Sequence, residues 1–143
     1  RTSSAASDVY KRQQLKFINS LLKLANTSID ISDGLIDDLK KMINRQSVSF
    51  HIFEKNIPIS NTLSQLIKIK KLRKIDITSR GDDYQILFTA NPIKSKFIKR
   101  ISNNTGIKIT KIGKIISGKN KSKIINIKNK QIEAKNKGYI HQF

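Results

Sequence analysis

Cysteine is absent from this sequence of 143 residues, and histidine and proline occur only twice each. Without cysteine the chain has no disulfide framework, no thiolate zinc site and no thiol nucleophile, and two histidines make an all-protein zinc site hard to assemble. No apolar run approaches the roughly 18 residues that a membrane-spanning helix needs. A chain of this length buries roughly two-thirds of its unfolded surface on folding, so we expect one domain with a real core.

Acidic residues are also scarce, because 10 Asp and Glu stand against 29 Lys and Arg and give a formal net charge of +19. Such an excess can neutralise phosphates, so a basic nucleic-acid-binding module is one hypothesis. Composition offers another explanation. The basic residues are 23 Lys and 6 Arg, and they accompany 26 Ile and many Asn, all of which A/T-rich codons encode. Genome bias can therefore produce this charge without a polyanionic partner.

The first 13 residues, RTSSAASDVYKRQ, differ in composition from the rest of the chain. They contain no Ile and no initiating Met, and they lack the apolar stretch of a signal peptide. The segment resembles a translated sequencing-adapter sequence. We therefore predict that residues 1–13 are a non-native segment and that residues 14–143 form the natural domain.

Hydrophobic periodicity predicts an α/β fold of the two-layer α+β type for residues 14–143. The predicted helices span about residues 15–25, 35–43, 63–72 and 93–101. The predicted strands span residues 28–31, 48–52 and 83–89. The Ile/Lys-rich region after residue 107 predicts short antiparallel strands with Ile toward the core and Lys toward solvent. The residues expected to face the core are Leu15, Ile18, Leu21, Leu22, Ala25, Leu35, Leu39, Met42, Ile43, Val48, Phe50, Ile52, Leu63, Leu66 and Ile67.

Helix boundaries are marked by capping residues. Ser32 or Asp33 is expected to cap the second helix. Asn91 followed by Pro92 predicts the start of the last helix, and the segment 103–106, which ends in Gly, predicts its end. The inward residues of that last helix are expected to be Ile93, Phe97, Ile98 and Ile101.

Six of the ten acids lie in two short segments. Asp30, Asp33, Asp37 and Asp38 fall within nine residues, at the predicted junction of a strand and a helix. Carboxylates that meet at such a corner repel one another unless a cation lies between them, and Mg²⁺ takes one or two carboxylates together with phosphate oxygens. The alternative is that these acids only cap the helix and favour its first turn.

The second acidic segment is Gly81-Asp82-Asp83-Tyr84, a turn that leads into a predicted strand. One carboxylate can point into a cleft there, although an ordinary Asp/Gly turn explains the same residues. The end of the chain, residues 138–143, carries aromatic residues that can either pack the tail down or stack on a ligand.

Five segments, taken in order, resemble motifs in the C-terminal half of thiamine-monophosphate kinases, a family in the aminoimidazole ribonucleotide synthetase-like superfamily. SIDISDGL (28–35) and the following DL (38–39) resemble the family's MDVSDGL and DL, and NIPIS (56–60) resembles LPLS. GDDYQILFT (81–89) resembles GEDYELLFT. IGKI (112–115) resembles IGRI, and GYIHQF (138–143) resembles GYDHF. The resemblance covers nearly all of residues 14–143. It implies the C-terminal domain of that fold, a mixed, mainly antiparallel sheet with helices packed on one side.

The resemblance implies ATP-dependent phosphorylation of thiamine monophosphate to thiamine diphosphate, by direct transfer of the γ-phosphoryl group with Mg²⁺ as cofactor. By position in the motifs, Asp30 and Asp33 are implied as Mg²⁺ ligands, Ser32 as a contact of the ATP phosphates, Asp82 as a substrate contact and Tyr139 as the aromatic contact of the thiamine. No catalytic group is assigned.

The chain also departs from the family pattern. Asp82 stands where the family has Glu, Gln85 replaces a usual Glu, and the register of the tail is shifted, which makes Phe143 the alternative to Tyr139. The family's N-terminal half carries most nucleotide and metal ligands and the main dimer contact, and we expect it to be missing here. The resemblance therefore implies a truncated cytoplasmic enzyme, homodimeric when intact, that is inactive as this chain alone.

Two alternatives remain open at this point. A nucleic-acid-binding module predicts a Lys/Arg stripe with interleaved aromatics, but residues 94–137 hold 14 Lys/Arg, one acid and one aromatic residue. The synthetase and hydrogenase-maturation branches of the same superfamily are the other alternative, and the GDDY turn and the GY tail favour the thiamine branch.

Overall fold

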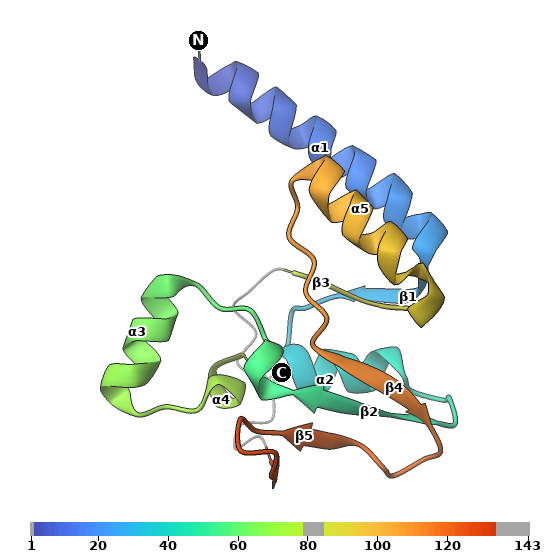
Figure 1. Ribbon diagram of the computed structural model, residues 1–143, viewed down its shortest axis with the longest axis vertical. Coiled ribbons are helices and arrows are strands. Elements are labelled where there is room, and N and C mark those ends of the chain that lie inside the picture. The colour runs from blue at the N-terminus through green and yellow to red at the C-terminus, as the bar shows by residue number, and fades with distance from the viewer. Residues whose placement is uncertain (1, 79–84, 134–143) are drawn as a thin grey trace, which may run out of the picture. The chain divides into compact units, whose positions relative to one another are not determined.

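The structure, a computed structural model, describes residues 2–78 and 85–133 (Figure 1). The chain forms two compact units. One, here called the helical unit, comprises residues 1–27 and 88–109, and the other, here called the sheet unit, comprises residues 28–87 and 110–143. In the described part of the chain, no helix is both long and apolar enough to cross a membrane.

The helical unit pairs two helices, α1 (Thr2–Leu24) and α5 (Ser95–Thr105). Phe17 and Leu21 of α1 are buried, but Leu15, Ile18 and Leu22 are exposed, so the expected apolar face of this helix is only partly covered. α5 is a single neighbouring helix, and one helix covers only a narrow stripe of α1. The apolar side chains of α1 that lie outside this stripe therefore stay exposed.

The boundaries of α5 are as expected, but its inward face is not. Asn91 Oδ1 accepts a hydrogen bond from Ile93 N at 3.0 Å, and Gly106 ends the helix with φ 70°. The helix starts, however, with the 3-10 turn η2 (Pro92–Lys94). Because a 3-10 turn has three residues per turn, Ile93 does not continue the stripe formed by the later residues. Ile93 and Phe97 are 84% and 55% exposed, so their predicted burial is wrong.

Strand β1 (Ala25–Asp30) pairs with β3 (Ile86–Ala90) in a two-stranded sheet, and the chain passes from one unit to the other within these strands. β1 begins earlier than the expected stretch at 28–31. β3 confirms the described part of the strand expected at 83–89.

The sheet unit contains a four-stranded sheet of order β4-β2-β5-β6 (Figure 1). Its strands are β2 (Val48–Phe53), β4 (Gly113–Ser117), β5 (Lys123–Ile125) and β6 (Gln131–Ile132). β2 runs antiparallel to β4 and parallel to β5, while β5 and β6 are antiparallel. The antiparallel pairing of β5 with β6 agrees with the antiparallel strands expected after residue 107, and the parallel pair of β2 and β5 makes the sheet mixed, as the resemblance implied. The chain reverses between β4 and β5, and because these two strands flank β2, one of them must run parallel to it.

The core of the sheet unit lies between the sheet and α2 (Leu35–Met42), whose expected stripe of Leu35, Leu39 and Met42 is buried. Phe50 and Ile52 of β2 are each 3% exposed and belong to the same cluster. The α/β class and the mixed sheet are thus confirmed.

Two further helices follow β2. After the 3-10 turn η1 (Glu54–Asn56) come α3 (Asn61–Lys70) and α4 (Lys74–Thr78). Ser60 caps α3, because its Oγ accepts a hydrogen bond from Leu63 N at 3.2 Å. The helix is as expected, but it buries none of its side chains, so the expected core positions Leu63 and Leu66 are wrong.

Candidate functional site

The first acidic segment forms the corner between β1 and α2. β1 ends at Asp30, and Gly34 precedes the helix with φ 123° and ψ 153°, a conformation that only glycine adopts without strain. Asp30 and Ser32 are exposed, and the Asp33 side chain is 25% exposed. The structure thus places Asp30, Ser32 and Asp33 on one strand-to-helix corner.

Neither Ser32 nor Asp33 caps α2, contrary to expectation. Their backbone N–H groups, together with that of Gly34, donate to Asp38 Oδ2 at 2.7, 2.9 and 3.3 Å. Asp38 is 1% exposed. This carboxylate from the first turn of the helix thus folds back and fixes the loop that presents Asp30 and Asp33.

Sequence reasoning missed this role of Asp38, although a signal was there. Leu35, Leu39 and Met42 define the buried stripe of α2. Asp38 lies on the same face, because it is three residues after Leu35 and four residues before Met42. A carboxylate inside an apolar stripe must be hydrogen-bonded in the core, because an unpaired buried charge is costly.

Lys41 completes the electrostatics of the corner. Its Nζ donates to Asp38 Oδ1 at 2.9 Å and also contacts Asp33 Oδ2. Burial opposes ionisation of Asp38, but the hydrogen bonds from Lys41, Ser32 N and Asp33 N outweigh it and hold the pKa of this carboxyl below its usual value. The same two carboxylates raise the pKa of Lys41.

The corner fits the ligand demand of Mg²⁺ as far as its own residues go. In the described ranges no three His, Cys, Asp or Glu residues are grouped as a complete metal cage. Mg²⁺ does not need one, because it binds through one or two carboxylates plus phosphate oxygens and water. Asp30 and Asp33 supply two carboxylates, and Asp33 is already next to a cation, the Lys41 ammonium.

The corner is tied to the segment that carries the second acidic motif. Ile31 N donates to Gln85 O at 2.7 Å. Gln85 is the first described residue after that motif, so the corner is hydrogen-bonded to the residue that follows the motif in the sequence. Asp82, Tyr139 and Phe143 lie outside the described residues, and of the predicted site residues the structure describes Asp30, Ser32 and Asp33.

No model of a protein family matches the sequence. Curated relatives do match. The chain is 35% identical over 125 residues to the thiamine-monophosphate kinase of Buchnera aphidicola subsp. Schizaphis graminum. It is 29% identical over 123 residues to the thiamine-monophosphate kinase of Aquifex aeolicus. Each match covers 85% of the chain. The chain belongs to the thiamine-monophosphate kinase family. It spans 37% and 36% of the length of these two relatives.

Solved structures of this family have a similar fold. The thiamine-monophosphate kinase from Stenotrophomonas maltophilia matches with a TM-score of 0.63 at 29% identity, over 73% of this chain and 32% of that one. The structure of AaThiL complexed with AMPPCP and TMP matches with a TM-score of 0.62 at 28% identity, over 88% of this chain and 37% of that one. The likeness extends the family assignment from sequence to fold.

Proposed function

We propose that this chain is one part of an ATP-dependent kinase that converts thiamine monophosphate to thiamine diphosphate and works in the cytoplasm. The observation that carries the proposal is the match of 85% of the chain to thiamine-monophosphate kinases, which includes the fixed corner between β1 and α2. A related structure holds AMPPCP and TMP, a pair that stands for ATP and the phosphate acceptor.

The reaction brings two polyanions together, so their repulsion and the charge of the transition state must be offset. A bound Mg²⁺ would supply positive charge for this purpose. Asp30 and Asp33 are the residues that would hold it. Asp38 and Lys41 act indirectly, since Asp38 fixes the loop and Lys41 pairs with the Asp33 carboxylate.

Ser32 has a narrower role than its sequence position alone suggests. Its backbone N–H is used by Asp38 Oδ2, so the group left for an ATP phosphate is its hydroxyl. Asp82 is proposed to contact thiamine monophosphate, and Tyr139, or Phe143 in its place, to contact the thiamine moiety. These three assignments rest on motif resemblance.

The proposal extends to what the chain needs around it. The relatives are almost three times as long as the matched segment, and we propose that an N-terminal domain supplies the remaining nucleotide and metal ligands and joins two subunits in a dimer. Residues 1–13 are proposed to be non-native, and residues 14–143 the C-terminal domain. The purified chain alone should therefore form no thiamine diphosphate from ATP and thiamine monophosphate, and measurable turnover would contradict this.

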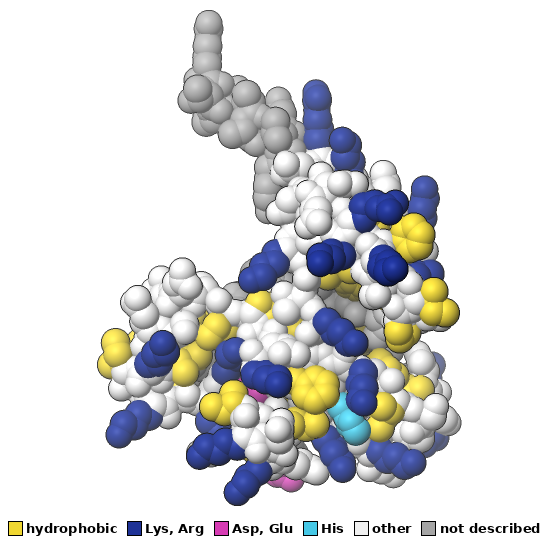
Figure 2. Space-filling view, viewed as in Figure 1, with side chains coloured by type: hydrophobic (Ala, Val, Ile, Leu, Met, Phe, Trp, Pro, Cys, Tyr) yellow, Lys and Arg dark blue, Asp and Glu magenta, His cyan; other side chains and the backbone are white. Residues whose placement is uncertain are grey.

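Lys and Arg side chains are spread over the face shown in Figure 2 and are not gathered into one stripe. On this face, the distribution favours the compositional explanation of the charge over a nucleic-acid-binding module.

The test uses the full-length enzyme encoded by the intact reading frame, with Asp33→Asn as the variant. The expected result is a fall of about 100-fold or more in Mg²⁺-dependent formation of thiamine diphosphate, because a metal ligand is lost. Asp37→Asn is the matched control, since it makes the same change four residues later, on α2 and outside the proposed ligand set. Near-normal turnover of Asp33→Asn, or an equal loss in both variants, would remove Asp33 from the metal site.

A further inference from the structure

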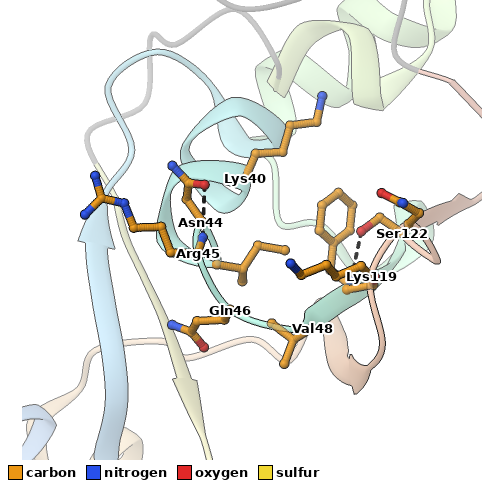
Figure 3. Close-up of a pocket in the computed structure, with 11 residues that line it drawn as sticks. Lys40, Asn44, Arg45, Gln46, Val48, Lys119 and Ser122 are labelled. Atoms are coloured by element: carbon orange, nitrogen blue, oxygen red, sulfur yellow. Dashed lines mark hydrogen bonds between the residues drawn. The ribbon is translucent and has the colours of Figure 1, made fainter.

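A polar depression lies at the C-terminal end of α2, away from the acidic corner. It has a volume of about 520 Å³ and is formed by the residues that follow the helix, by β2 and by the loop between β4 and β5 (Figure 3). The helix of eight residues is about 12 Å long, so this pocket is separate from the corner that precedes the helix. We propose that it binds a small anion that carries phosphate groups, independently of the proposed kinase reaction.

The charge of the pocket is of one sign. Its lining, as far as the structure describes it, includes the cations Lys40, Arg45 and Lys119 and no acidic residue. Among the described residues, no carboxylate forms an ion pair with any of these three side chains. Lys41, the neighbour of Lys40, is by contrast fully engaged with Asp33 and Asp38. Three cations without counter-charges favour an anionic ligand.

The loop that carries Lys119 is anchored to β2. Ser49 is 1% exposed, and its Oγ donates to Gly118 O at 2.5 Å and accepts from Lys121 N at 3.0 Å. Gly118 N donates to Ser47 O at 2.9 Å. These contacts hold the turn in place, so Lys119 is presented by an ordered piece of backbone.

Figure 3 shows how the charged side chains are arranged. The amino group of Lys119 is turned toward the middle of the pocket, whereas the charged ends of Lys40 and Arg45 extend from its rim. Both rim side chains are exposed and long, so they can fold over an anion that enters.

Neutral donors remain available between these cations. Ser122 Oγ accepts a hydrogen bond from Phe50 N at 3.1 Å, and Asn44 Oδ1 accepts one from Arg45 N at 3.0 Å. Because both oxygens act as acceptors, the Ser122 hydroxyl hydrogen and the Asn44 amide N–H groups are left to donate. Donors of this kind around a cluster of cations are what a phosphate group needs.

The end of a helix opposes anion binding, since its carbonyls carry a partial negative charge. Here the effect is small, because α2 has only eight residues and some carbonyls at its end already accept hydrogen bonds. Ile43 N donates to Leu39 O, Asn44 N to Lys41 O, and Gln46 N to Ile43 O, each at 3.2 Å. Three full positive charges outweigh the residual half charge of the helix.

The experiment is a titration of the ¹⁵N-labelled chain with inorganic pyrophosphate at constant ionic strength, followed by amide chemical shifts. We expect saturable binding with shifts concentrated at residues 44–46 and 118–122. In the double variant Arg45→Gln/Lys119→Gln the dissociation constant should rise at least about tenfold, because two charge-assisted contacts are lost. The matched control is Lys128→Gln/Lys130→Gln, which removes two exposed lysines from the turn before β6 and should bind as the parent chain does.

Three outcomes would overturn the proposal. They are the absence of saturation, shifts spread over the lysine-rich surface, and an equal loss of affinity in the control variant. A short single-stranded oligodeoxynucleotide forms the second arm. If it binds at residues 44–46 and 118–122 while pyrophosphate does not, the site is for nucleic acid and the small-anion proposal is wrong. Unchanged amide dispersion of both variants shows that folding does not cause the difference.

Discussion

The two ends of α2 have opposite charge and are held in opposite ways. At the start of the helix a buried carboxylate, Asp38, gathers three backbone N–H groups and pairs with Lys41. At its end, Lys40, Arg45 and Lys119 have no carboxylate partner in the described ranges, and serine hydroxyls fix the adjoining loop. The difference teaches that, in a chain with a net charge of +19, one buried acid can organise backbone while neighbouring cations go without a carboxylate partner among the described residues.

Asp38→Ala should break the acidic end most severely. The substitution leaves the N–H groups of Ser32, Asp33 and Gly34 without their acceptor and Lys41 with one fewer partner. We expect the free energy of unfolding, measured by urea denaturation, to fall by about 3 kcal/mol.

Asp30→Ala is the matched control for this experiment, because Asp30 is an exposed carboxylate at the same corner. Its substitution should change the free energy of unfolding by less than about 0.5 kcal/mol. Equal effects of the two substitutions would show that Asp38 does not hold the corner together.

Ser49→Ala tests the basic end and should have a smaller effect. It removes the hydroxyl that joins Gly118 O and Lys121 N, without changing any charge. We expect a loss of about 1–2 kcal/mol in the free energy of unfolding, because a partly buried donor and acceptor lose their partner.

The same variant should bind pyrophosphate several-fold more weakly, since the loop that carries Lys119 is no longer fixed. Ser47→Ala is the control. Only the backbone oxygen of Ser47 takes part in the anchor, so its exposed side chain can be removed with little effect. If Ser49→Ala is destabilised but binds pyrophosphate as tightly as the parent chain, the anchored loop does not shape the pocket.

The elements at both ends of α2 were predictable from the sequence, because they carry strong periodic signals. The stripe of Leu35, Leu39 and Met42 and the alternation of Phe50 and Ile52 correspond to buried faces. The corner itself was also predictable, since acids are rare in this chain and cluster between a strand and a helix.

Other features depend on contacts that periodicity does not encode. The hydrogen bonds from the preceding loop to Asp38 require the conformation of Gly34. The parallel pairing of β5 with β2 depends on the strand order, in which β4 and β5 lie on either side of β2. The exposure of Ile93 reflects a 3-10 turn that local propensity does not distinguish from an α-helical start. Of the predicted site, Asp82, Tyr139 and Phe143 lie outside the described residues, so their roles stay predictions.

The smallest expected effect is on the pH dependence of the free energy of unfolding, which should differ between variants at the two ends of α2. The pKa of Asp38 is below its ordinary value of 3.8 when the chain is folded, so the unfolded chain binds the proton more readily. The stability that Asp38 contributes is therefore fully present above about pH 4–5 and is lost as the pH falls through the lower, folded pKa.

The difference in unfolding free energy between the parent chain and Asp38→Asn should stay constant from pH 7 to 5 and shrink below pH 4. The difference for Ser49→Ala should not depend on pH over the same range, because no titratable group is changed. A pH-independent difference for Asp38→Asn would mean that the ionised carboxylate does not fix the corner.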